Sequence, residues 1–315
     1  MNRKAVIISI SGTYLTQKEI HVIKKEKPWG IILFKRNILS EYQLINLTTK
    51  IRSIMRDKKF PILVDEEGGR VSRLSNFIDN SSYNQKFFGE IYESNKNIGI
   101  KFYKLYIDSL SKILLKTGIN INTSPVLDLT KNQTHEVIGN RSFSTKPDTI
   151  NELGKLSVKF YKRNKIATVI KHIPGHGGAN LDSHFKLPII NDTLQSLKKN
   201  DFRCFKNMSS FFAMTAHILY TSIDKKNNVT HSNIAIKKII RKEIGFKGIL
   251  ISDDISMKSL QYDFIKNANL ALKAGCNLVL YCGGKTEEIK KLLKVMPYID
   301  KFTAKKTSEF YKFLS

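Results

Sequence analysis

The chain has 315 residues, of which 41% are hydrophobic and 25% charged, a composition typical of a globular protein rather than a disordered or fibrous one. No apolar stretch approaches the roughly 20 residues needed to span a bilayer, and AVIISI near the start is too short for a secretion signal. We therefore expect a cytoplasmic protein with no membrane partner. Cys204, Cys276 and Cys282 lack CxxC spacing and fit reduced thiols.

The charge balance raises nucleic-acid binding as a candidate function. Lys and Arg number 53 against 27 Asp and Glu, which gives a formal net charge of +26. A nucleic-acid surface concentrates its charge in a patch, whereas lysine is scattered along this whole chain among abundant Ile and Asn. Biased amino-acid usage explains that pattern, so we expect no nucleic-acid partner. A basic, non-catalytic nucleic-acid-binding barrel is the alternative of a different class.

Short apolar runs recur along the chain, each followed by polar or glycine-bearing residues and then by a segment of helical period. We predict eight strands, at residues 5–10, 30–34, 61–64, 119–124, 167–171, 211–215, 248–252 and 277–281. One helical segment is well delimited, because Ser232 can cap it and Gly245 can end it. Its apolar face comprises Ile236, Ile239, Ile240 and Ile244.

An eightfold β–α alternation in a chain of this length predicts an α/β fold, a single (β/α)8 TIM-type barrel that allows irregular strands. We see no linker and no internal repeat, so we expect one catalytic domain over residues 1–315. A doubly wound parallel sheet is the alternative fold. The barrel makes the sharper prediction, because its functional residues should lie at the C-terminal ends of the strands.

Polar motifs stand at five of the predicted strand ends. They are residues 65–73 (DEEGGRVSR), 122–128, Lys171-His172, Thr215-Ala216-His217 and Ser252-Asp253-Asp254. Carboxylates and cations that converge on one concave face suit a ligand with many hydroxyl groups, which suggests a sugar. Neither a P-loop nor a GxGxxG pattern is present, so we expect no nucleotide cofactor.

The stretch KHIPGHGGANLDSH, residues 171–184, raises zinc as a rival, because it contains His172, His176, Asp182 and His184. An HxxxH pair binds metal readily when both histidines lie on one helix face. Pro174 and the glycines around it disfavour a helix there. We therefore expect no metal site.

Six segments carry a resemblance to a known family. In order along nearly the whole chain, they are DEEGGRVSRL, SPVLDL, IGNRSFS, KHIPGHGGANLDSH, MTAHILY and GILISDDISM. This set resembles the single-domain bacterial β-N-acetylglucosaminidases of glycoside hydrolase family 3, which act in peptidoglycan recycling. The pair KH-x-PGHG…DSH and SDD-x-SM is highly specific. Ile173, where relatives often carry Phe, is a small departure.

The resemblance implies a retaining hydrolase that removes terminal β-1,4-linked N-acetylglucosamine from small-molecule substrates, the N-acetylglucosaminyl-anhydromuramyl peptides. It implies no cofactor, and we expect a monomer. Five residues match the family's contacts to the non-reducing-end sugar, namely Asp65, Arg73, Arg141, Lys171 and His172. Because a site that holds the terminal hydroxyls leaves no room for more sugar on that side, cleavage should be exo.

Retention requires a nucleophile and a proton donor on either side of the glycosidic bond. Asp253 matches the family nucleophile. Since neighbouring strand residues point in opposite directions, we expect only Asp253 to face the barrel mouth and Asp254 to hold the following loop or cap a helix. The resemblance makes His184, hydrogen-bonded to Asp182, the acid/base, and a histidine can exchange protons near neutral pH. We hypothesise that residues 175–184 close over bound substrate, because this segment is rich in glycine.

Other residues are assigned supporting roles. Arg70 and Glu67 are expected to form an ion pair inside the barrel mouth, and Trp29 is expected to pack just before the second strand. We expect His176 and His217 to be structural or supporting. Phosphorolysis is the rival chemistry, because a histidine acid/base lets phosphate approach with less repulsion than a carboxylate would impose.

Overall fold

The computed structural model describes residues 2–131, 138–178 and 187–315. Eight parallel strands close into a barrel in the order β1-β10-β9-β7-β5-β4-β3-β2. Their bounds are β1 (Lys4–Ile8), β2 (Pro28–Leu33), β3 (Ile62–Val64), β4 (Ile121–Asn122), β5 (Ala167–Ile173), β7 (Phe212–Thr215), β9 (Ile249–Asp254) and β10 (Leu278–Tyr281). The predicted (β/α)8 barrel is confirmed, and the doubly wound sheet is excluded because the sheet closes on itself.

All eight predicted strands are present, but two extend further at their C-terminal ends than the sequence indicated. β5 runs to Ile173 because Ile173 pairs with Thr215 of β7, and β9 runs to Asp254 because that residue pairs with Leu280 of β10. Several polar residues assigned to the strand ends therefore lie within the strands themselves. A second sheet, which we did not predict, joins β6 (Ile189–Ile190) in parallel to β8 (Leu219–Tyr220).

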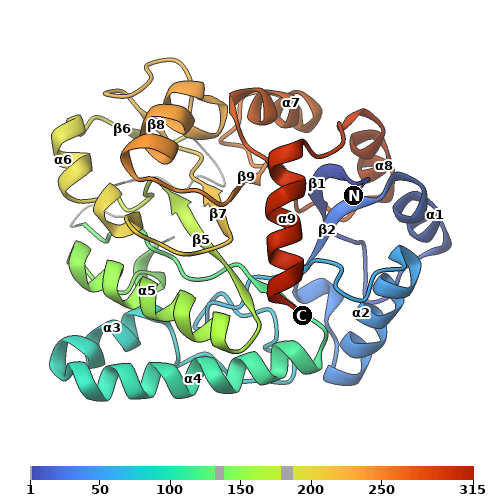
Figure 1. Ribbon diagram of the computed structural model, residues 1–315, viewed down its shortest axis with the longest axis horizontal. Coiled ribbons are helices and arrows are strands. Elements are labelled where there is room, and N and C mark those ends of the chain that lie inside the picture. Colours follow the sequence, from blue (N-terminus) through green and yellow to red (C-terminus); the bar gives the residue numbers. More distant parts are fainter. Residues whose placement is uncertain (1, 132–137, 179–186) are drawn as a thin grey trace.

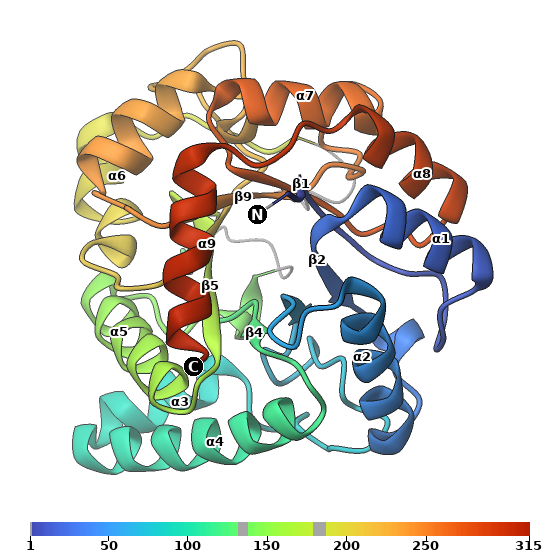
Figure 2. The same ribbon diagram turned by 45° about the vertical axis from the view of Figure 1, so that its right-hand side comes forward.

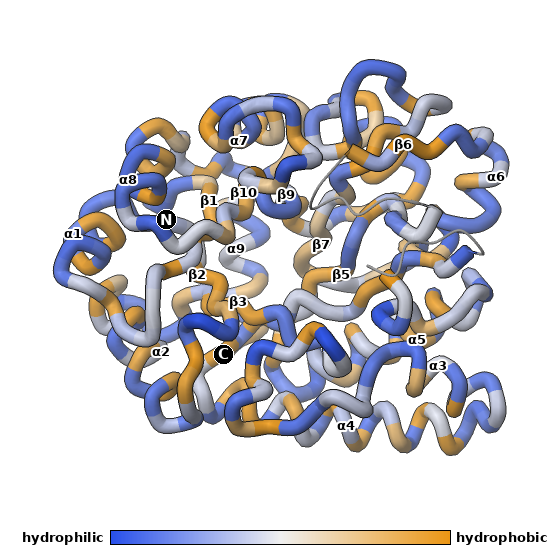
Figure 3. The backbone as a smooth tube through the Cα atoms, turned by 180° about the vertical axis from the view of Figure 1, so that it is seen from behind, coloured by the Kyte–Doolittle hydropathy of each residue, from blue (hydrophilic) through white to orange (hydrophobic). Residues whose placement is uncertain are grey.

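Helices surround the barrel (Figure 1). They are α1 (Gln17–Glu26), α2 (Glu41–Met55), α3 (Gln85–Ser94), α4 (Lys96–Lys116), α5 (Pro147–Arg163), α6 (Leu194–Lys199), α7 (Phe264–Ala274), α8 (Thr286–Val295) and α9 (Lys301–Phe313), with short 3-10 turns η1 (Lys35–Asn37), η2 (Gly139–Arg141), η3 (Phe202–Phe205) and η4 (Val229–His231). Figure 3 shows apolar strands in the centre and helices that alternate between apolar and polar residues. Among the described residues, we find no helix whose length and apolar character would allow it to cross a membrane.

The helix that begins near Ser232 has the predicted start and apolar face but a different winding. The Ser232 hydroxyl accepts a hydrogen bond from the Ala235 N–H at 3.1 Å, and the four isoleucines of its apolar face are buried. Residues Ala235–Glu243 form a π-helix, η5, in which the Ile244 N–H bonds to the Ile239 carbonyl at 2.9 Å. Apolar spacing predicts which face is buried, but it does not distinguish i→i+4 from i→i+5 bonding.

The N-terminal end of the barrel is closed by α9, which lies across it (Figure 2). Phe310 of α9 is fully buried against the strand interior, with its ring centroid 5.3 Å from that of Phe212 and 6.5 Å from that of Trp29. The Trp29 indole N–H donates to the Thr307 hydroxyl at 2.9 Å. Trp29 is thus a packed residue as expected, but it lies inside β2 rather than before it.

Candidate active site

A cavity of about 320 Å³ opens among the C-terminal ends of the strands. Its ionisable walls comprise Asp65, Glu67, Arg73, Arg141, Lys171, His172, His176, Asp253, Asp254 and Cys282, and its apolar walls comprise Phe34, Val71, Ile138, Met214, Met257 and Leu280. All five residues that the resemblance assigned to the sugar lie here, together with Asp253. The cavity therefore lies at the end of the barrel where the topology predicts functional residues.

Glu67, which follows β3, is the centre of a buried ion network. The Lys171 ammonium lies 2.6 Å from Glu67 Oε1 and 2.9 Å from Asp65 Oδ1. The Arg141 guanidinium makes a bidentate contact with Glu67, at 2.7 Å to Oε2 and 2.9 Å to Oε1. The expected Arg70–Glu67 pair is wrong. The Glu67 carboxylate is buried between Arg141, which lies beyond β4, and Lys171 of β5, whereas Arg70 is exposed.

The network keeps its members charged at neutral pH. Burial raises the pKa of Glu67, but Arg141 and Lys171 lower it further, to about 2. Burial also raises the pKa of Asp65, but Lys171 and Arg73 hold that pKa well below the ordinary range. Although burial lowers the pKa of the Lys171 ammonium, Asp65 and Glu67 raise it above its usual value. The cavity therefore presents fixed donors and acceptors to a polar ligand.

Asp253 and Asp254, the last two residues of β9, are used differently. Burial raises the pKa of Asp253, but His217 and His172 lower it below its ordinary value, so the carboxylate is ionised as a nucleophile must be. Asp254 accepts hydrogen bonds from the Ser256 N–H and hydroxyl and from the Cys282 N–H, at 3.1, 2.7 and 3.1 Å. Asp254 thus holds the loop, as expected, but it also lines the cavity, so the expectation that only one of the pair faces the mouth is wrong.

His217 contacts the backbone at the C-terminal end of β9. Its ring lies 2.7 Å from the Thr230 hydroxyl through Nδ1 and 3.0 Å from the Asp254 carbonyl through Nε2. Burial lowers its pKa. Because both ring nitrogens contact protein atoms, the expected supporting role of His217 is confirmed.

The described part of the glycine-rich segment is tightly packed. A Cβ at Gly177 would lie 1.5 Å from the Leu129 carbonyl oxygen, and one at Gly175, where φ is +140°, would lie 2.9 Å from Asp201 Cβ. The Tyr220 hydroxyl also donates to the Gly175 carbonyl. Close packing therefore requires glycine at both positions, a reason for these residues that the sequence pattern did not reveal. Asp182 and His184 lie outside the described residues, so their roles and the closing of the loop stay predictions.

One buried residue of the site had no role assigned from sequence. The Asp128 carboxylate accepts hydrogen bonds from the His172 and His176 N–H groups and contacts the His172 ring. The motif SPVLDL indicated that Asp128 lies at a strand end. Sequence does not show that its carboxylate contacts His172 and His176 at the end of the neighbouring strand. Across residues 2–131, 138–178 and 187–315, no three His, Cys, Asp or Glu side chains gather as a metal site.

A (β/α)8 barrel with an ionised carboxylate facing a dense set of sugar-type donors and acceptors is the arrangement of a carbohydrate-cleaving enzyme. The family described as "Glycosyl hydrolase family 3 N terminal domain" matches residues 5–304. The chain therefore belongs to glycosyl hydrolase family 3, and it is a glycoside hydrolase.

Individual relatives point to one branch of that family. The chain is 32% identical to a "Beta-hexosaminidase" of Methylobacillus flagellatus over 296 aligned residues. The alignment covers 92% of this chain and 84% of the relative. The chain is 34% identical over 288 residues to a "Beta-hexosaminidase" of Neisseria gonorrhoeae, with 89% and 78% covered. The crystal structure of NagZ from Neisseria gonorrhoeae in complex with N-trifluoroacetyl-D-glucosamine superposes with a TM-score of 0.88 at 30% identity and covers 100% of this chain and 91% of that one.

Proposed function

We infer that this chain, as one catalytic domain, is an exo-acting, retaining β-N-acetylglucosaminidase. Its substrates would be peptidoglycan fragments that carry a terminal β-1,4-linked N-acetylglucosamine, and its place would be cell-wall recycling in the cytoplasm. The observation that carries the proposal is that Asp253 and the network of Asp65, Glu67, Arg141 and Lys171 line one cavity. The name of the similar enzymes and the N-trifluoroacetyl-D-glucosamine bound to one of them support the choice of sugar.

In this proposal Asp253 attacks the anomeric carbon and forms a covalent glycosyl-enzyme, which water then hydrolyses with retention. That attack requires an ionised carboxylate. Burial raises the pKa of Asp253, but His217 and His172 lower it below the ordinary value, so this requirement is met. His184, oriented by Asp182, would protonate the leaving oxygen and then activate the water. Asp65, Arg73, Arg141, Lys171 and His172 would hold the terminal sugar through its hydroxyls and acetamido oxygen.

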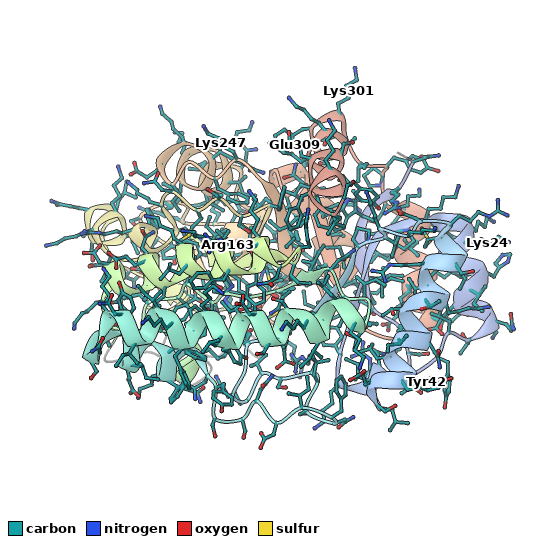
Figure 4. The ribbon with its side chains drawn as sticks, turned by 60° about the horizontal axis from the view of Figure 1, so that its bottom comes forward. Lys24, Tyr42, Arg163, Lys247, Lys301 and Glu309 are labelled. Carbon is teal, nitrogen blue, oxygen red and sulfur yellow. The ribbon has the colours of Figure 1, made fainter. Side chains whose placement is uncertain are left out.

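The charge distribution favours this function over nucleic-acid binding. Figure 4 shows that the labelled Lys24, Arg163, Lys247 and Lys301 extend from four different parts of the molecule rather than from one surface. Long-range attraction of an anionic substrate needs no patch, because the field of the whole protein steers it. Muropeptides carry carboxylates, so the excess positive charge is compatible with the proposed substrates.

The test is hydrolysis of an aryl β-N-acetylglucosaminide by the wild type and by Asp253→Ala, with the matching β-glucoside as substrate control. We expect the wild type to cleave the acetamido sugar far faster than the glucoside, and Asp253→Ala to lose at least about 10³-fold in kcat/KM, since the nucleophile is removed. A wild type inactive on the acetamido sugar would overturn the proposal. N-acetylglucosaminyl-anhydromuramyl peptide tests the natural substrate class, and sugar phosphate as the main product in phosphate buffer would indicate phosphorolysis instead.

A further inference from the structure

Asp128 lies beyond the end of β4, in contact with the cavity residues His172 and His176, and its carboxylate is fully buried. The residue does not line the cavity itself. The three hydrogen bonds of its carboxylate all go to β5 and the turn that follows it, at His172 and His176. Asp128 thus joins the end of one barrel strand to the start of the glycine-rich segment through a single side chain.

The two oxygens of this carboxylate have separate partners. Oδ1 accepts the His172 N–H at 3.1 Å and the His176 N–H at 2.8 Å, so it fixes the backbone. Oδ2 lies 2.7 Å from Nδ1 of the His172 ring, so it fixes the ring. This separation allows the ring contact to be changed without removing either backbone contact.

The charge of Asp128 decides which ring nitrogen carries the proton. Burial raises the pKa of Asp128, but the His172 ring beside its carboxylate lowers the pKa below the ordinary value. An ionised carboxylate has no proton to donate, so Nδ1 of His172 must be the donor. In the neutral form of the ring this places the lone pair at Nε2, and no described residue hydrogen-bonds that atom.

We propose that Asp128 is a positioning residue for catalysis, which holds His172 in the Nδ1–H tautomer so that Nε2 accepts a hydrogen bond from a hydroxyl of the terminal sugar. The inference rests on the proposed function for the identity of the ligand. It assigns His172 the part of an acceptor, which complements the donors Lys171, Arg73 and Arg141 on the same cavity. A hydroxyl held between such an acceptor and a cation has both its proton and its lone pair engaged.

The variant that isolates this effect is Asp128→Asn. An amide oxygen in the Oδ1 position can still accept both backbone N–H groups, whereas an amide nitrogen in the Oδ2 position can only donate to Nδ1. The opposite orientation of the amide would lose two bonds to retain one, so it is disfavoured. Asp128→Asn should therefore reverse the tautomer of His172 and place a donor where the sugar needs an acceptor.

The experiment combines kinetics with nitrogen NMR of the histidine rings. With an aryl β-N-acetylglucosaminide, Asp128→Asn should lower kcat/KM by on the order of 10- to 100-fold, as loss of a partner that orients a ligating histidine does. In a His172→Ala background the same change should have little further effect, because the two residues act as one unit. In ¹⁵N spectra His172 should be an Nδ1–H ring in the wild type and an Nε2–H ring in Asp128→Asn.

Asp57→Asn is the matched control, because Asp57 pairs with Arg3 and Tyr311 away from the cavity. It should affect stability without altering the His172 tautomer, and its effect on kcat/KM should be the same with and without His172. Full multiplication of the Asp128→Asn and His172→Ala effects, or an Nε2–H ring in the wild type, would overturn the proposal. A wild type that cleaves no N-acetylglucosaminide would instead refute the proposed function, and the spectra would still test the tautomer.

Discussion

The two ends of this barrel are built from opposite kinds of side chain. The C-terminal mouth gathers buried ions, with Lys171 and Arg141 around Glu67. The N-terminal end is sealed by aromatic rings, with Phe310 of α9 set against Phe212 and Trp29. The same strands therefore carry the ionisable groups of the cavity at one end and the packed aromatic closure at the other. A variant at one end should therefore have consequences that a variant at the other does not.

The largest effect should come from Glu67→Gln, which removes the charge that both Arg141 and Lys171 contact. The change leaves Arg141 without its carboxylate partner and Lys171 with Asp65 alone, which costs on the order of 3–5 kcal/mol, and it disturbs the proposed sugar contacts. We expect the unfolding free energy to fall by that amount and kcat/KM to fall by on the order of 100-fold. Urea unfolding and steady-state kinetics measure the two. Lost activity at unchanged stability would show that the mouth serves function alone.

Phe310→Ala should be nearly as costly in stability but silent in catalysis. Truncation of a buried Phe costs about 3–5 kcal/mol through lost burial and the cavity that remains. We expect kcat/KM at 25 °C to stay within about twofold of the wild type, because the cavity of the active site lies at the other end. Phe302→Ala, on the same helix but 41% exposed, is the control and should cost less than about 0.5 kcal/mol. A large fall in kcat/KM would show that the two ends are coupled.

Acidification should act on the mouth first. Burial lowers the pKa of His176 to about 4, against roughly 6.5 in the unfolded chain. The unfolded state therefore binds the proton first, and the stability that the neutral ring provides above pH 6.5 is lost as the pH falls toward 4, by up to about 3 kcal/mol. Glu67, whose pKa is about 2, adds to the loss below pH 4.5.

Urea midpoints at pH 7.0, 5.5 and 4.5 measure this loss. His176→Gln has no such ring to protonate, so its stability should vary less over the same range. His231, whose pKa is also lowered to about 4 by burial, should keep part of the dependence in that variant. Equal pH dependence in the wild type and His176→Gln would contradict the assignment.

The smallest effect should come from Thr307→Val at the sealed end. The Thr307 hydroxyl is the acceptor for the buried Trp29 N–H, and an unsatisfied donor of this kind costs about 1–2 kcal/mol. Thermal or urea unfolding should show that loss with kcat/KM unchanged. Ser308→Ala, exposed on the next position of α9, should be close to neutral. A neutral Thr307→Val would indicate that packing alone seals this end.

The architecture could be predicted from sequence because barrel strands are continuous apolar runs. Where a strand stops depends on its neighbour, which is why β5 and β9 extended beyond their apolar residues to pair with β7 and β10. The sheet of β6 and β8 was missed for the same reason, since two residues carry almost no signal. The role of α9 was also hidden, because nothing in an amphipathic pattern tells which surface its apolar face will meet.

The site was predictable in its members but not in its pairings. Resemblance placed Asp65, Arg141 and Lys171 together, and the strand-end rule gave the face on which they meet. The partner of Glu67 depended on which residue was buried beside it, and Arg141 is 74 positions farther along the chain. The close packing of Gly177 could not be predicted, because sequence shows the missing side chain but not the Leu129 carbonyl that lies in its place.

The hydrogen bond between Trp29 and Thr307 joins positions 278 residues apart, and this separation bears on when the bond forms during folding. Contacts so distant in sequence form slowly, because a long loop must close before they contribute any stability. Water can reach the apolar interior of the strands until α9 docks. Docking of α9 thus closes this end of the barrel. An intermediate in which α9 has not yet docked would expose aromatic rings that chaperones or other unfolded chains can bind.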